Sequence, residues 1–182
     1  MEQKRGFVHD MLDLKVLTLF ALSLLDGPVP FSTLLEICMQ DDGVDYLNLG
    51  EAVGQPVHTG HLTEAGDVVS LTPLGREHGA VTWDSLAQPL REKVRQAAEA
   101  YKRLQQRQER VRTDIEELAD GTFLVKVTLG SPVGDLMHLA LPAVSKHQAR
   151  LLKQSMFDQA DNVYAAVLNL LLAHERQEPE DL

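Results

Sequence analysis

Cysteine is almost absent from the sequence, because Cys38 is the single one in 182 residues. It excludes an intrachain disulfide framework, and such rarity is typical of a protein in a reducing compartment. Long apolar runs are also absent. The longest, residues 16–25, is too short to span a bilayer and lies too far from the N-terminus, behind Asp10 and Asp13, for a signal peptide. We therefore expect a cytoplasmic protein with no membrane partner.

Positive charge is scarce as well. The chain has 17 Lys and Arg against 27 Asp and Glu, a formal net charge of -10. This balance argues against a protein that coats nucleic acid or anionic lipid non-specifically. The shortage is greatest between Lys15 and Arg76, an interval that contains no other Lys or Arg. The carboxylates of this interval are Asp26, Glu36, Asp41, Asp42, Asp45, Glu51, Glu64 and Asp67.

Signatures of catalysis are missing too. The sequence has no phosphate-binding glycine loop, no Ser nucleophile elbow and no paired-carboxylate signature. His58, His61 and His78 could be imagined as a metal site, but no Cys or carboxylate lies at a recognised ligand spacing around them, which favours a loop-and-cap role. Cys38 falls on the inward stripe of its helix, as an inert small hydrophobe would. We predict no enzyme, no metal and no cofactor.

What the sequence does contain is an ordered series of helix signals near its start. A first helix is predicted from an N-cap at Asp13 to the stop at Gly27-Pro28, and a second over residues 31–39. A third is suggested within residues 44–62, where Asn48 and Glu51 have the spacing of a capping box. Two interior glycines cost this helix roughly 1 kcal/mol each and an interior proline roughly 3, so we expect it to kink or end near Gln55.

A hairpin signal follows these helices. Residues 62–64 and 68–71 can pair around Gly66, because glycine tolerates the positive φ of a tight turn. Thr72-Pro73 then has the pattern of an N-cap and first residue of another helical turn. Three helices followed by a two-stranded ribbon is the order of a winged helix-turn-helix, so this fold is predicted for residues 1–86.

From Pro89 the apolar period changes to alternating steps of four and three, which is a heptad pattern. One interpretation is a long helix that lies against the core of its own chain. The other is a homodimer seam, which Gln108 would weaken but not forbid. The seam residues would be Leu90, Val94, Ala97, Tyr101, Leu104 and Val111.

The C-terminal section has strand alternation and then helical spacing. Residues 113–118, 122–129 and 136–141, separated by turns at Asp120-Gly121 and at 131–135, predict a three-stranded antiparallel meander that Pro142 ends. Two helices are then predicted, the first with a Ser145–Gln148 capping box and the second capped by Asp161; they could also be one kinked rod. The expected regions are 1–86, a connecting helix at 87–112, a small α+β domain at 113–176 and a polar tail at 177–182.

Six segments spread over residues 13–152 carry a resemblance to a known family. They are DLKVLTLFALSLL, DYLNLGEAVGQPVHTGHL, VVSLTPLGRE, QPLREKV, DGTFLVKVTL and LALPAVSKHQARLL. With these segments in this order, nearly the whole chain resembles a bacterial family known as domain of unknown function 4364. The resemblance implies an N-terminal winged helix, of the kind that many transcriptional regulators use, and a small C-terminal α+β domain. It brings no substrate, cofactor or active-site residue.

Two functional hypotheses from different classes remain. In the first, the chain is a dimeric transcriptional regulator that contacts DNA through the third helix and through basic residues of the connecting helix. The candidates for that contact are Tyr46, Asn48, Gln55, His58, Arg103 and Arg107. In the second, the winged helix is degenerate for DNA, because docking on a duplex requires cations, and its acidic surface engages a protein partner.

Overall fold

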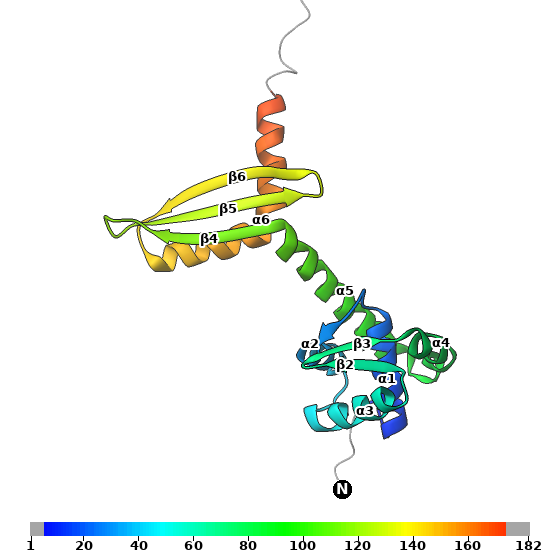
Figure 1. Ribbon diagram of the computed structural model, residues 1–182. Coiled ribbons are helices and arrows are strands. Elements are labelled where there is room, and N and C mark those ends of the chain that lie inside the picture. Colours follow the sequence, from blue (N-terminus) through cyan, green and yellow to red (C-terminus); the bar gives the residue numbers. More distant parts are fainter. Residues whose placement is uncertain (1–5, 174–182) are drawn as a thin grey trace, which may run out of the picture. The chain divides into compact units, whose positions relative to one another are not determined.

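The computed structural model describes residues 6–173 (Figure 1). This part of the chain is α+β, with six α-helices and two three-stranded antiparallel sheets. It divides into two compact units, one up to Arg103 and one from Leu104 onwards, and each is described by itself. In the described range no helix is both long enough and apolar enough to cross a membrane.

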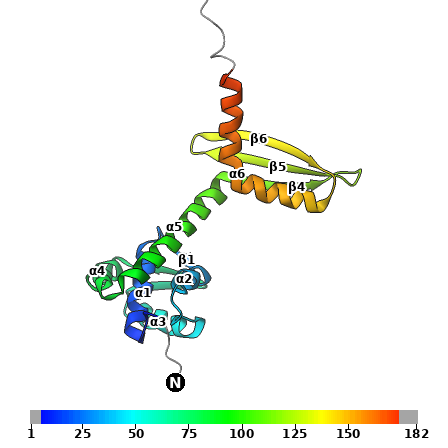
Figure 2. The ribbon, with the colours of Figure 1, turned by 180° about the vertical axis from the view of Figure 1, so that it is seen from behind.

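The first unit is a helical cluster against a small sheet (Figure 2). Strand β3 lies in the middle of the order β1-β3-β2, and Gly66 turns the β2–β3 hairpin at a φ of 64°. The hairpin was predicted; β1 was not, because two residues give no alternation to recognise. The elements are α1 (Met11–Ser23), β1 (Val29–Pro30), α2 (Phe31–Cys38), α3 (Tyr46–His58), β2 (Leu62–Ala65), β3 (Val68–Leu71), α4 (Pro73–Thr82), a 3-10 turn (Trp83–Ser85) and α5 (Gln88–Arg110).

Two predicted N-caps are displaced by one turn. Asp10, not Asp13, caps α1, and its carboxylate accepts from the Asp13 N–H at 2.8 Å. Asp45, not Asn48, caps α3, and Asn48 is the third helical residue of a complete capping box. In both cases two cap-forming residues stand three positions apart, so the same spacing fits either as the cap.

Helix α3 also runs further than predicted. It continues through Pro56 to His58, so it does not end near Gln55. Pro56 is buried, as are Leu49, Ala52 and Val53 on the same helix. Burial of this face outweighs the low helix propensity of the sequence, because most helical stability in proteins comes from tertiary packing.

The first part of α5 belongs to the core of the first unit. Leu90, Val94 and Ala98 are fully buried there, and Ala97 and Tyr101 pack against the same core. Leu90 and Val94 are therefore not available to a partner, and the interpretation of a helix against its own chain is the correct one for this half of the heptad pattern. Of the expected connecting helix at 87–112, residues 88–110 are helical, and the first part packs on this core.

The second unit is an antiparallel sheet with a helix on one face. Strands β4 (Val111–Glu117), β5 (Phe123–Ser131) and β6 (Gly134–Ala143) form the predicted meander in the order β4-β5-β6. Val111 therefore opens a strand instead of ending a helical seam. Pro142 does not end the sheet but pairs with Leu124 inside β6. It is tolerated because β6 is an edge strand, where a residue without an N–H breaks no ladder.

One long helix, α6 (Lys146–Ala173), covers both predicted helical segments, which agrees with the single-rod alternative. Half of the predicted Ser145–Gln148 capping box is present. Ser145 Oγ accepts from the Gln148 N–H at 3.2 Å, but the Gln148 side-chain oxygen accepts from the Val144 N–H at 2.9 Å instead of from the Ser145 N–H. Residues Ala149, Met156 and Ala160 pack the first part of α6 onto the sheet. Figures 1 and 2 show that the ribbon of α6 bends partway along its length and that its end extends beyond the sheet. The polar tail at 177–182 and the last residues of the expected domain lie outside the described residues.

Candidate functional site

The predicted nucleic-acid contacts on α3 lie at its two ends. Tyr46 starts the helix with 63 % of its surface exposed, and its ring meets that of Phe31 edge to face, with centroids 5.4 Å apart. Gln55 and His58 are exposed in the last turns. These three side chains are accessible to a ligand or a partner.

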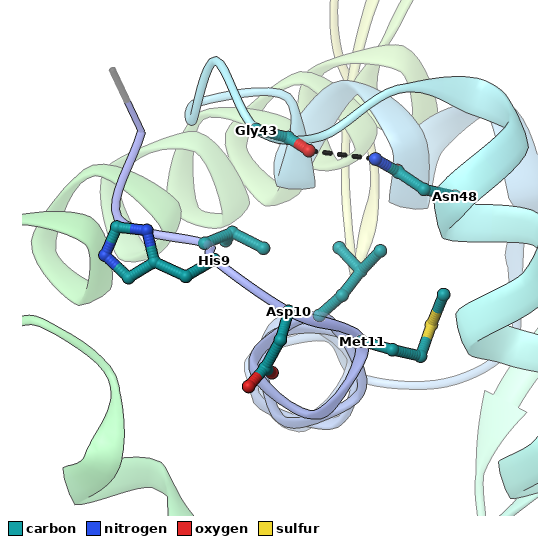
Figure 3. Close-up of a pocket in the computed structure, with 7 residues that line it drawn as sticks. His9, Asp10, Met11, Gly43 and Asn48 are labelled. Carbon is teal, nitrogen blue, oxygen red and sulfur yellow. Dashed lines mark hydrogen bonds between the residues drawn. The ribbon is translucent and has the colours of Figure 1, made fainter. Parts of the chain in front are cut away.

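Asn48 is engaged within its own loop. Its Oδ1 accepts from the Asp45 N–H at 2.8 Å, and its Nδ2 donates to the Gly43 carbonyl at 2.9 Å (Figure 3). Reading a base edge would require breaking both of these hydrogen bonds. This candidate contact residue therefore serves the start of α3.

Figure 3 shows the cleft beside Asn48, a space of about 170 Å³ between the start of α1 and the loop before α3. His9, Asp10 and Met11 line it from the α1 side, and Gly43 and Asn48 from the other. The Asp10 carboxylate is occupied as the α1 cap, and Asn48 as described above. Because the Asp10 carboxylate and the Asn48 amide already have hydrogen-bond partners, the cleft offers few polar groups to a ligand.

Asp41 holds the loop beside this cleft, and sequence reasoning missed it. Its side chain is buried, and its carboxylate accepts from the N–H groups of Phe7 at 2.6 Å, Val8 at 3.3 Å and Gly43 at 2.9 Å. A buried carboxylate is tolerated when several donors satisfy it. Asp41 thus ties the segment before α1 to the loop between α2 and α3.

One cation does reach α3 from elsewhere in the sequence. Lys15 on α1 donates from its ammonium to the Gln55 side-chain oxygen. Lys15 forms no ion pair with any of the residues 6–173. The signal that could have found it is helical spacing, because Lys15 shares one face of α1 with Leu12 and Leu19.

The basic residues predicted to help on α5 differ in environment. Arg107 faces Asp158 at 3.8 Å and Arg110 faces Asp161 at 2.8 Å, both on α6. Arg103 is exposed, and no ion pair of it occurs among residues 6–173. Arg107 and Arg110 of α5 thus form ion pairs with carboxylates of their own chain.

Two of the three histidines meet. His61 Nε2 lies 2.9 Å from His78 Nδ1, and His61 Nδ1 lies 2.8 Å from Thr59 Oγ1. His58 is not part of this chain of contacts. Over residues 6–173, no three His, Cys, Asp or Glu side chains gather in a way that could hold a metal ion.

The approach of the two imidazoles depends on a glycine in α4. A Cβ built on Gly75 would lie 2.1 Å from the His61 carbonyl oxygen, far inside van der Waals contact. Thr72 Oγ1, the predicted N-cap of α4, accepts from the Gly75 N–H at 3.0 Å. The absence of a side chain at Gly75 lets α4 pack directly on the backbone of residue 61.

The family model described as domain of unknown function (DUF4364) matches residues 14–171, and the chain belongs to this family. No curated protein and no solved structure matches the chain. The membership carries no activity or ligand, so a function has to be argued from the residues.

Proposed function

We propose that this chain is a winged-helix regulatory protein whose α3 and hairpin surface contacts a protein partner. The order α1-β1-α2-α3-β2-β3, with the sheet order β1-β3-β2, supports a winged helix. In that fold α3 is the helix that is presented for recognition. Function does not follow from the fold alone, so the side chains of this surface decide the partner class.

The observation that carries the proposal is the charge of this surface. On α3 and the β2–β3 hairpin the exposed ionised side chains are Glu51, Glu64 and Asp67, and neither element contains Lys or Arg. Non-specific affinity for DNA comes almost entirely from cations that displace counterions from phosphate. An acidic surface repels a phosphate backbone and suits a basic or neutral protein surface.

A specific observation supports DNA as the second candidate. The Lys15 ammonium is hydrogen-bonded to the Gln55 side chain and has no acidic partner within residues 6–173, and His58 lies one turn further along α3. With a single cation, the affinity for DNA would be low and would depend only weakly on salt. Proteins that bind an operator contact several phosphates, so their affinity falls steeply as salt rises. The two candidates therefore predict different binding to a duplex.

The first test is binding of full-length protein to a fluorescent duplex of mixed sequence, at low and at moderate salt. The protein-contact proposal predicts no binding at either salt concentration. Binding at low salt that weakens steeply as salt rises would establish the DNA candidate and overturn the proposal.

The second test locates the partner surface. We expect proteins that co-purify with the wild-type chain to be lost with the double variant Glu51→Lys, Glu64→Lys and retained with Glu92→Lys on α5. Glu92 is an exposed carboxylate away from α3 and the hairpin. Equal retention by both variants would contradict a role for the α3 and hairpin surface.

We also propose a homodimer, now through the end of α6. Val167, Leu168, Leu170, Leu171 and Leu172 are exposed there, and residues 162–173 include no charged side chain. An apolar patch of this kind marks an interaction surface. A second copy offers the same uncharged apolar surface, and isologous pairing of one patch with itself is the usual way in which proteins dimerise.

A further inference from the structure

A groove of about 400 Å³ runs between α1, the end of α3 and α4 in the first unit. This volume falls in the range of small-molecule sites, roughly 300 to 1,000 Å³. Leu12, Val16 and Leu19 of α1 line one side, and Pro56 contributes from α3. Leu12 has 67 % of its surface exposed, so the groove presents apolar surface that no residue of the described range 6–173 covers.

The polar groups of the groove are donors or can become donors. They are Lys15, Gln55, Thr59, His61, His78 and Thr82, and no carboxylate is among the residues that line the groove. The Lys15 ammonium is hydrogen-bonded to the neutral Gln55 amide and, within residues 6–173, is not paired with an acid. The groove therefore combines the Lys15 cation with apolar lining, in a chain whose net charge is -10. This combination suits an anion with an apolar body.

The histidine pair gives the groove a second potential cation. A hydroxyl has one hydrogen, and Thr59 Oγ1 can donate it to the Gln55 carbonyl at 3.1 Å. Thr59 then accepts from His61 Nδ1–H, and His61 Nε2 accepts from His78 Nδ1–H. With the Thr59 hydroxyl in this orientation, these tautomers leave His78 Nε2 as a lone pair at the end of the chain of contacts. When this nitrogen gains a proton, His78 becomes an imidazolium and a donor.

We propose that the groove between α1, α3 and α4 binds a monocarboxylate with an apolar body, held by Lys15 and by protonated His78. The carboxylate accepts from the Lys15 ammonium and from His78 Nε2–H, and such charge-assisted bonds are the strong ones. The hydrocarbon part covers Leu12, Val16, Leu19 and Pro56. A proton from solvent goes to His78 Nε2 as the anion binds, so binding and proton uptake are linked. Lys15 and His61 are the other titratable groups that line the groove.

The site goes beyond the proposed function and does not depend on it, because it can be tested without DNA or a protein partner. Isothermal titration calorimetry of the full chain with octanoate is the direct measurement, with 1-octanol and octylammonium as probes of equal length. We expect octanoate to bind at least about tenfold more tightly than either, a difference of about 1.4 kcal/mol. Equal binding of octanoate and octanol would overturn the proposal, as would no binding of octanoate.

Variants locate the site. Lys15→Met keeps the apolar stem and should weaken octanoate binding about tenfold or more, whereas Lys15→Arg should retain most of it. The matched control is Lys93→Met, an exposed lysine on α5 outside the groove. Circular dichroism of each variant confirms that it is folded. Identical affinities for Lys15→Met and Lys93→Met would show binding elsewhere and would refute the groove as the site.

The number of protons taken up when octanoate binds is a further test, because a change in packing alone would not alter it. The octanoate binding enthalpy of the wild type, measured in buffers of different ionisation enthalpy, should reveal proton uptake. The variant His78→Gln keeps a donor toward His61 but cannot take up a proton, so its binding enthalpy should not depend on the buffer. Equal proton uptake in wild type and His78→Gln would overturn the role of His78.

Discussion

The two units of the molecule treat charge and apolar surface in opposite ways. In the first unit a carboxylate, Asp41, is buried and satisfied by three backbone donors, and the exposed apolar residues are scattered over several elements. In the second unit no carboxylate of the described residues is buried, and apolar residues gather at the exposed end of α6. The first unit thus places a charge in its interior, whereas the second concentrates exposed apolar residues on one segment.

The largest expected effect concerns the access of solvent to Cys38 in the core of the first unit. Burial raises the pKa of the Cys38 thiol from 9.0 to about 12. At about pH 8 the thiolate fraction then falls about a thousandfold below that of the ordinary thiol. We expect native Cys38 to react with a chromogenic disulfide at least about a thousandfold more slowly than the urea-unfolded chain. Comparable rates would mean that the core opens to solvent.

The same pKa shift has a consequence for stability. A thiol whose pKa is higher in the folded state contributes its full stabilisation below about pH 9, and this contribution is lost as the pH rises toward about 12. Over this window the wild type should lose free energy of unfolding faster than Cys38→Ala does. Parallel curves in urea denaturation would contradict this expectation.

The next effect compares buried and exposed leucines of the first unit. Leu34 is fully buried, and Leu34→Ala should lower the free energy of unfolding by about 2–5 kcal/mol through lost transfer energy and a cavity. Leu47 on α3 is 80 % exposed, and Leu47→Ala should change it by less than about 0.5 kcal/mol. Urea denaturation measures both, and similar losses would refute the core assignment.

The contribution of the buried Asp41 carboxylate to stability can be compared with that of its exposed neighbour Asp42. Asp41→Ala leaves three backbone N–H groups without their acceptor and should cost about 2–3 kcal/mol in unfolding free energy. Asp42→Ala removes an exposed carboxylate of the same loop and should cost almost nothing. Equal destabilisation would show that Asp41 acts through general charge and not through its hydrogen bonds.

The apolar end of α6 predicts the oligomeric state. Leu171, 66 % exposed, lies in the proposed dimer surface, and Leu171→Glu should weaken association at least about tenfold by placing a charge in an apolar contact. Leu104, 45 % exposed on α5, is the matched control from the heptad pattern. Sedimentation should show a dimer for wild type and Leu104→Glu. A monomeric wild type, or dissociation only with Leu104→Glu, would contradict the α6 proposal.

The smallest effect concerns the surface ion pairs of the second unit. Arg110 and Asp161 lie 2.8 Å apart, but both side chains are about half exposed. Solvent and salt screen such pairs, so Asp161→Asn should cost less than about 1 kcal/mol, and less still at high salt. A larger loss that persists at high salt would show that the pair carries more of the fold than its exposure suggests.

Much of the fold could be predicted from residue patterns, because helical and strand periods act locally. The hairpin around Gly66, the Thr72 cap and the C-terminal meander were all predicted. Pro142 was misjudged because its tolerance depends on β6 being an edge strand, which local sequence does not reveal. The heptad pattern was ambiguous because a helix presents the same apolar face to its own core and to a partner.

The candidate sites were harder to predict, because they join residues distant in the sequence. Lys15 meets Gln55 forty positions away, and His61 meets His78 across the hairpin. Asn48 was an attractive base reader by residue type, yet its neighbours Gly43 and Asp45 already bind both ends of its amide. Residue type indicated what these side chains could do, and only tertiary packing determined which of them are free to do it.

Gly75 has a consequence for how this family can vary. Because a methyl group at this position would collide with the carbonyl of residue 61, even alanine would push α4 away and separate the two imidazoles. The contact between His61 and His78 thus requires glycine, with only a hydrogen atom as its side chain, at position 75 of α4. We expect family members with a side chain at this position to have lost the imidazole pair, even where both histidines are retained.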